Sequence, residues 1–226
     1  MTYDEIIKNR HWPALNRLTA ITDETESEIV HNFLKDCEVK RFLEIGSNSA
    51  KMSHNLLSPS WELLQSGWHG VLCEPDPHAC VELIKCVDED NLSDNVTIFN
   101  GGITLESKIS EFHLALGRSS ISSFDQLWVD TPDISNSIKK SKQFTILANT
   151  LSFQDFLNKM GNDFSYIITD VEGLDLALIE SIEWDQFPNL KLLCTEAPMS
   201  VAEHMYKYGF KLVKRTSYNT YYTKYN

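Results

Sequence analysis

The sequence lacks the features of a membrane protein and of a disulfide-stabilised protein. No window approaches the roughly 18 consecutive apolar residues that a transmembrane helix needs. The first residues, Thr2 to Glu5, lack the basic and apolar blocks of a signal peptide. The five cysteines are odd in number and contain no Cys-x-x-Cys pair, which favours reduced, packed thiols over disulfides or a zinc site. We therefore expect a cytoplasmic protein.

Positive charge is also scarce. Lys and Arg number 20 against 32 Asp and Glu, so the net charge is −12. Such a chain offers no broad basic surface, and we expect neither nucleic acid nor a membrane as its partner. A small neutral or cationic ligand suits it better. Its 226 residues, 42% of them hydrophobic, fit one globular domain.

Two segments of the same design stand close together in the sequence. Phe42-Leu43-Glu44-Ile45-Gly46 is an apolar run that ends with an acid and a glycine, and Gly70-Val71-Leu72-Cys73-Glu74-Pro75-Asp76 repeats this design. Buried parallel strands are short apolar runs, and a glycine lets the backbone turn sharply close to a ligand. Ligands of open α/β sheets bind beyond the carboxyl ends of the strands. The two acids therefore predict one shared site.

Strand and helix patterns alternate along the chain. Acids from Asp23 to Glu28 crowd an expected first helical turn, Asp76-Pro77 is typical of an N-cap followed by proline, and Ser152 with Asp155 resembles a capping box. The expected strands are 41–45, 70–74, 96–99, the run 164–173 that ends in acids and glycine, and 191–196, with an extra strand at 111–116 and a terminal hairpin from 210–213 and 220–223.

This alternation predicts an α/β fold, a mostly parallel sheet with a C-terminal antiparallel edge hairpin. We assign residues 1–39 to an N-terminal arm and leading helix, and 40–226 to the domain itself. Within the domain, 117–149 has no clear period and is expected to form a lid or insertion. Its serines 119 to 123 suit either contact with a sugar or a solvated loop.

The acid that ends the second strand suits a nucleoside. A carboxylate has two acceptor oxygens, so Glu74 can accept hydrogen bonds from both ribose hydroxyls; the alternative is an acidic helix-capping turn without a ligand. The turn after the first strand has Gly46 but no Gly-x-Gly-x-x-Gly motif, unlike dinucleotide and phosphate-binding loops. S-adenosylmethionine has no phosphate and carries a sulfonium cation. It therefore suits Glu44, Ser47 and Asn48 better.

Four segments in register resemble the FkbM family of S-adenosylmethionine-dependent methyltransferases. They are Phe42-Leu43-Glu44-Ile45-Gly46, Ser53-His54-Asn55, the stretch from Gly67 to Pro77, and Ile168-Thr169-Asp170-Val171-Glu172-Gly173-Leu174-Asp175. The likeness runs from about residue 40 to 200. It implies a Rossmann-like class I methyltransferase fold, S-adenosylmethionine as methyl donor, and a hydroxyl acceptor on a sugar, glycan or natural product.

The resemblance also implies which residues bind the cofactor. Glu44, Gly46, Ser47 and Asn48 would line its methionine end, and Glu74 its ribose. Pro75 and Asp76 in the second turn, and Gly102 after the third strand, complete the expected cofactor site.

The acids of the fourth strand are the candidates for chemistry. Asp170 and Glu172 lie two apart on an expected extended segment, hence on the same side of it. Methyl transfer to oxygen needs a group that takes or stabilises the acceptor proton, and Asp170 is the first candidate, Glu172 the second. A divalent cation held by Asp170, Glu172 and Glu196 is the alternative that we do not favour. Glu172 as a purely structural helix cap is a further alternative.

Two other functions stay open. Ala50, Lys51 and Ile168 depart from the FkbM pattern, which is compatible with a catalytically silent cofactor-binding or interaction protein on the same fold. A nicotinamide-dependent oxidoreductase is disfavoured by the missing glycines.

Overall fold

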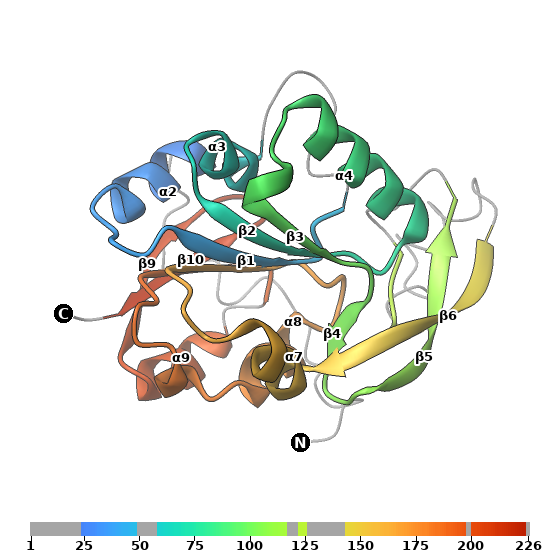
Figure 1. Ribbon diagram of the computed structural model, residues 1–226. Coiled ribbons are helices and arrows are strands. Elements are labelled where there is room, and N and C mark those ends of the chain that lie inside the picture. Colours follow the sequence, from blue (N-terminus) through green and yellow to red (C-terminus); the bar gives the residue numbers. More distant parts are fainter. Residues whose placement is uncertain (1–23, 49–57, 117–121, 126–142, 198–199, 225–226) are drawn as a thin grey trace.

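The computed structural model describes residues 24–48, 58–116, 122–125, 143–197 and 200–224 (Figure 1). Most of the expected N-terminal arm, the segment Ser53-His54-Asn55 and most of the expected lid lie outside these residues.

The larger of two sheets has seven strands in the order β3-β2-β1-β7-β8-β10-β9. Its parallel strands are β1 (Arg41–Ile45), β2 (His69–Cys73), β3 (Val96–Phe99), β7 (Tyr166–Thr169) and β8 (Leu192–Thr195). The hairpin of β9 (Phe210–Arg215) and β10 (Thr220–Lys224) closes the sheet, with β10 antiparallel to both β8 and β9. The predicted α/β fold, with a mostly parallel sheet and an antiparallel C-terminal edge hairpin, is confirmed.

Helices cover both faces of this sheet (Figure 1). One face carries α2 (Glu26–Leu34), α3 (Pro59–Gln65) and α4 (Pro77–Glu89); the other carries α7 (Phe153–Met160), α8 (Asp175–Ser181) and α9 (Val201–Lys207). Short 3-10 turns lie at Ser93–Asn95 and Trp184–Gln186.

Three helices begin where the sequence predicts. Thr25 and Glu28 form a capping box at α2, Asp76 accepts hydrogen bonds from two N–H groups of the first turn of α4, and Ser152 caps α7. These side chains satisfy N–H groups that have no partner within the helix.

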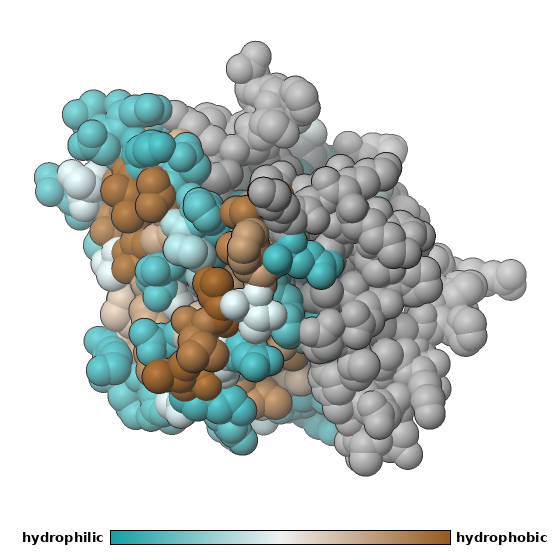
Figure 2. All heavy atoms as spheres, turned by 90° about the vertical axis from the view of Figure 1, so that its right-hand side faces the viewer, coloured by the Kyte–Doolittle hydropathy of each residue, from teal (hydrophilic) through white to brown (hydrophobic). Residues whose placement is uncertain are grey.

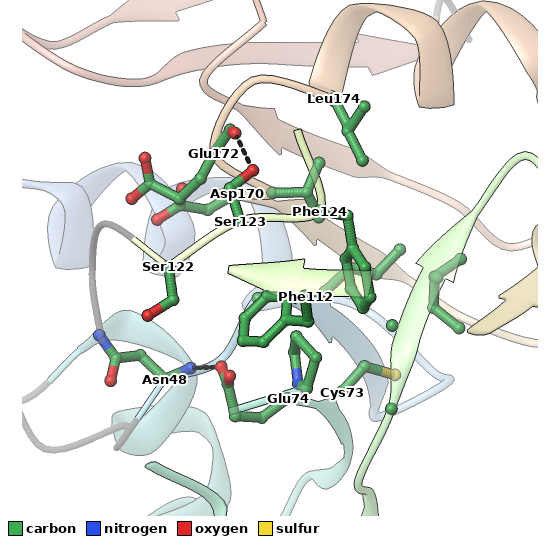
Figure 3. Close-up of a pocket in the computed structure, with 17 residues that line it drawn as sticks. Asn48, Cys73, Glu74, Phe112, Ser122, Ser123, Phe124, Asp170, Glu172 and Leu174 are labelled. Carbon is green, nitrogen blue, oxygen red and sulfur yellow. Dashed lines mark hydrogen bonds between the residues drawn. The ribbon is translucent and has the colours of Figure 1, made fainter. Parts of the chain in front are cut away.

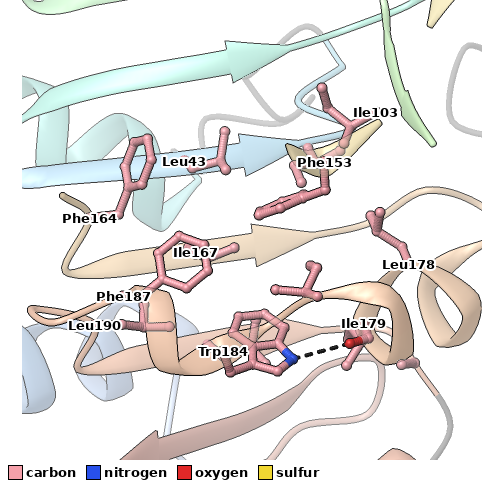
Figure 4. Packing of buried hydrophobic residues seen from close by; sticks show 14 of the residues in the cluster. Leu43, Ile103, Phe153, Phe164, Ile167, Leu178, Ile179, Trp184, Phe187 and Leu190 are labelled. Atoms are coloured by element: carbon pink, nitrogen blue, oxygen red, sulfur yellow. Dashed lines mark hydrogen bonds between the residues drawn. The ribbon is translucent and has the colours of Figure 1, made fainter. Parts of the chain in front are cut away.

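The central strand is buried on both faces. Leu43 and Ile45 belong to a cluster with residues of α7, α8 and the turn at Trp184, while Phe42 belongs to the cluster on the opposite side, with Trp61 of α3. Figure 4 shows the first of these clusters, in which the Trp184 indole N–H donates to the Ile179 carbonyl over 3.1 Å. Burial on both faces explains why apolar residues stand at 42, 43 and 45 instead of at every second position.

A smaller, three-stranded sheet lies beyond the carboxyl ends of the main strands (Figure 1). It contains β4 (Gly102–Thr104), β5 (Lys108–Ala115) and β6 (Gln143–Ser152) in the order β4-β6-β5. β5 covers most of the extra strand expected at 111–116 and is antiparallel to β6, which the sequence did not predict. Most of β6 is exposed or half-buried, so its sequence lacks the alternation of apolar and polar residues that marks a strand. Its pairing with β5 stabilises it instead.

The smaller sheet exposes apolar side chains. Leu105, Ile109 and Leu147 are 53%, 66% and 73% exposed, and apolar patches are visible on this side of the molecule in Figure 2. Within the described parts of the chain, no helix is both long and apolar enough to cross a membrane.

Candidate active site

A cavity opens where the carboxyl ends of the main strands meet the smaller sheet (Figure 3). Its walls come from the turns after β1, β2, β3 and β7 and from β5. Seven of the ten residues that the sequence predicted for the site line it: Gly46, Asn48, Glu74, Pro75, Gly102, Asp170 and Glu172.

The turn after β1 can be built only with glycine. Gly46 has φ 87°, and a Cβ atom there would lie 1.8 Å from the carbonyl oxygen of Asp170. The N–H groups of Gly46 and Ser47 both donate to the Cys73 carbonyl, over 2.9 and 3.1 Å. The glycine thus allows the ends of β1 and β7 to approach each other at the cavity floor.

Glu74 is fixed at the cavity wall by two backbone groups. One carboxylate oxygen accepts from the Asn48 N–H over 2.6 Å and the other from the Asp76 N–H over 2.7 Å (Figure 3). A carboxylate has about four acceptor positions. One therefore remains on each oxygen, which is the arrangement that a vicinal diol requires.

The acids after β7 reach the cavity in a way that the sequence did not predict. The expected extended segment is wrong, because Glu172 has φ 47° and Gly173 φ 106°, and the backbone turns sharply. Asp170 and Glu172 nevertheless both line the cavity. The alternative of Glu172 as a helix cap finds no support, since α8 has no side-chain cap and the Val171 N–H donates to Asp175 instead.

Three predicted site residues lie outside the cavity lining. Side chains alternate along a strand, so Glu44 points away from the face of Leu43 and Ile45, to the α3 side of the sheet. There its carboxyl group forms a hydrogen bond with the Ser60 hydroxyl. Ser47 is buried against Cys73, and Asp76 caps α4. Their contact with a cofactor stays a prediction.

Burial raises the pKa of every acid around the cavity for which a shift is resolved. It raises the pKa of Glu44 and of Glu74 to about 7, with Ser60 and two backbone N–H groups acting in the opposite direction. Burial, then the charges of Glu196 and Asp175, raise the pKa of Glu172 to about 8. The pKa of Asp170 is also well above its ordinary value, first through burial and then through Glu196 and Glu172.

This electrostatic arrangement predicts an unusual pH dependence. Because these folded-state pKa values exceed those of unfolded acids, the folded protein binds more protons between about pH 4.5 and 8, and its free energy of unfolding falls as pH rises. His69 and His204, with pKa values lowered by burial, oppose this only below about pH 6.5. We expect a loss on the order of 2 kcal/mol between pH 6.5 and 8.5 in urea denaturation.

The matched control for the pH dependence is Glu172→Gln. It removes one titrating group and should flatten the decrease. A free energy of unfolding that stays constant or rises over this range would contradict the pKa values.

Part of the wall was not assigned from the sequence. Phe112 of β5 packs against Phe124 with ring centroids 4.7 Å apart, and a Cβ atom on Gly102 would lie 2.3 Å from the Phe124 ring. Ser122 and Ser123 complete this wall. The serines at 119 to 123 suggested a ligand contact, with a solvated loop as the alternative. No pattern in the sequence indicated Phe112 and Phe124, because only the smaller sheet brings them to the cavity.

The described residues give no support to a metal centre. No group of three or more His, Cys, Asp or Glu side chains among them is arranged to hold a metal ion. Glu196, which the sequence grouped with Asp170 and Glu172, does not line the cavity.

No protein-family model matches the chain, and no curated protein matches its sequence. Many solved structures are similar to it, among them the following three. The N-terminal domain of human METTL16 in complex with SAH has 13% identity and a TM-score of 0.46, with 88% of this chain and 68% of that one covered. The methyltransferase FkbM from Methylobacillus flagellatus KT has 12% identity and a TM-score of 0.46, with 81% of this chain and 43% of that one covered. A methyltransferase from Geobacter sulfurreducens has 9% identity and a TM-score of 0.49, with 99% of this chain and 86% of that one covered.

The chain spans 66% of the METTL16 MTase domain structure and less than half of the FkbM chain. At these identities and TM-scores the similarity assigns no function to the chain, and it does not single out the FkbM family. The strand order β3-β2-β1-β7-β8 and the closing antiparallel hairpin give the chain a Rossmann-like α/β fold.

Proposed function

We propose that the protein is an S-adenosylmethionine-dependent O-methyltransferase that acts on a hydroxyl of a sugar, glycan or natural product. The observation that carries the proposal is the acidic lining of the cavity. Glu74, Asp170 and Glu172 line it, and no Lys, Arg or His is among its described lining residues. Such a site favours a cationic ligand over the phosphates of a dinucleotide.

The described residues fit this cofactor. Glu74 has one acceptor position left on each oxygen for the ribose hydroxyls. Asp170, which lines the cavity, has a buried Oδ1 atom without a hydrogen-bond partner among the described residues. Buried acceptors of this kind are costly unless a ligand donates to them. Ammonium and hydroxyl groups are suitable donors.

The proposed chemistry divides between cofactor and protein. S-adenosylmethionine supplies an activated methyl group. The protein supplies orientation and a group that takes the proton of the acceptor hydroxyl. Asp170 suits this role because burial and its acidic neighbours raise its pKa, which strengthens it as a base. Glu172 is the second candidate.

Glu74→Gln should weaken binding of S-adenosylhomocysteine, measured by calorimetry, by roughly 1–3 kcal/mol through lost charge-assisted hydrogen bonds. Glutamine keeps the size of the side chain and one acceptor for the backbone N–H groups. We prefer it to alanine, which would leave the Asn48 and Asp76 N–H groups without their acceptor.

The control is Asp94→Asn, an exposed acid in the turn before β3 that makes the same change in net charge. Affinity should stay unchanged, since Asp94 does not line the cavity. Equal affinity of Glu74→Gln and the unmodified protein would remove the ribose assignment. Tight binding of NADH in the same assay would favour an oxidoreductase instead. Binding without turnover on any acceptor would favour a silent cofactor-binding protein.

A further inference from the structure

Glu172 has a backbone conformation that a glutamate rarely adopts. Its φ of 47° lies in the left-handed region, and Gly173 follows at φ 106°. Glycine would occupy this position without strain, and asparagine or aspartate with less. Strained residues of this kind are retained at functional sites, where the side chain itself is needed.

The conformation is held by a hydrogen bond from the smaller sheet. The buried Ser123 hydroxyl donates to the Glu172 carbonyl over 2.8 Å and accepts from the Asp125 N–H over 2.9 Å (Figure 3). The backbone of Ser123 in turn exchanges two hydrogen bonds with His113 of β5. The turn is therefore fixed to a sheet, and Glu172 is held at the cavity wall.

None of the residues that the structure describes is a counterion for the Glu172 carboxylate. Within the described residues, none donates a hydrogen bond to it or forms an ion pair with it, although its backbone carbonyl is bonded. Asp170 lines the same cavity, and its buried Oδ1 atom also has no hydrogen-bond partner among the described residues. Acidic Glu196 and Asp175 lie close enough to repel Glu172.

The strand order indicates which ligand this charge meets. β1 lies between β2 and β7, so Glu74 at the end of β2 and Glu172 after β7 are on opposite sides of the Gly46 turn. We place the ribose at Glu74 and the methionine end of the cofactor at the turn after β1. The wall beyond β7 therefore faces the acceptor.

We infer that Glu172 binds a positively charged amine of the methyl acceptor, so that the acceptors are hydroxyl compounds carrying an amine, of which an amino sugar is the simplest. This inference rests on the proposed function. A carboxylate forms strong charge-assisted hydrogen bonds with an ammonium group. The same acidic wall repels uronic acids and phosphorylated sugars.

The test is methyl transfer from radiolabelled S-adenosylmethionine to matched sugar triplets. Each contains a neutral sugar, its 2-amino-2-deoxy analogue and its uronic acid, as in glucose, glucosamine and glucuronic acid. We expect a kcat/KM about tenfold or more higher for the amino sugar than for the neutral one, and no transfer to the uronic acid. A neutral or acidic sugar used equally well, or no amino sugar accepted, overturns the inference.

Two variants separate charge recognition from a structural role. Glu172→Gln should bring the ratio of kcat/KM for amino and neutral sugars to within about threefold of one. Glu172→Gly should also abolish the preference while raising the thermal midpoint, because glycine relieves the backbone strain. A purely structural Glu172 would show a lower midpoint in Glu172→Gly and an unchanged preference in Glu172→Gln, and this result overturns the inference.

Calorimetry with S-adenosylhomocysteine distinguishes the two levels of failure. No binding by the unmodified protein means that the proposed function itself is wrong. Binding without a preference for amino sugars means that only the inference about Glu172 is wrong.

Discussion

Gly46→Ala is expected to destabilise the protein by roughly 3–5 kcal/mol, a large part of the stability of an ordinary domain. Two effects add. Alanine disfavours the backbone conformation at φ 87°, and its Cβ would lie 1.8 Å from the Asp170 carbonyl oxygen and 2.8 Å from the carbonyl carbon. Backbone atoms cannot move aside as a flexible side chain can. The ends of β1 and β7 must therefore separate.

Gly67→Ala is the matched control. Gly67 has φ 83°, and no atom lies within 4 Å of a Cβ built there. Gly67→Ala should lower the free energy of unfolding by about 1–2 kcal/mol, the cost of the backbone conformation alone. Urea denaturation of both variants gives the steric term as the difference. Equal losses would show that β1 and β7 are not in the close contact that forms the cavity floor.

Asp170→Asn is expected to lower turnover by roughly 10²–10⁴-fold, the usual contribution of a general base. Asparagine has nearly the same shape but cannot accept a proton. The backbone at this position is held independently of the side chain, because the Asp170 N–H donates to the Ile45 carbonyl over 2.9 Å. Affinity for S-adenosylhomocysteine should stay close to that of the unmodified protein. The free energy of unfolding should not fall, since one of several mutually repelling acids is neutralised.

The control for this prediction is Asp94→Asn, an exposed acid in the turn before β3. It makes the same change in net charge and should leave turnover unaffected. An unchanged rate for Asp170→Asn excludes Asp170 from the chemistry. Loss of cofactor affinity together with turnover would make it a binding residue instead.

Local sequence determined most of the architecture. Apolar runs such as 41–45 and 70–74 form the parallel strands, because both faces of the sheet are covered and every position can be buried. Capping residues such as Asp76 and Ser152 define where helices begin, since the N–H groups that they satisfy lie within a few residues. The acids that end strands were predicted to meet at one edge, and Glu74 and Asp170 do so.

Tertiary structure decided which of these acids reach the cavity. Glu44 and Glu74 follow the same sequence design, yet the side chain of Glu44 points to the α3 side of the sheet. Glu172 reaches the cavity only through a left-handed turn, although the sequence suggests an extended strand. The wall formed by Phe112 and Phe124 depends on β5 pairing with the distant β6.

The physical reason is the range of the interactions. Hydrophobic periodicity and helix caps act between residues close in sequence, so the chain by itself determines the strands, the helices and the acidic edge. The direction of a side chain at a strand end, and the partner that holds a strained turn, depend on atoms from remote segments. Ser123 and Glu172 are 49 residues apart, and only the folded chain brings them together.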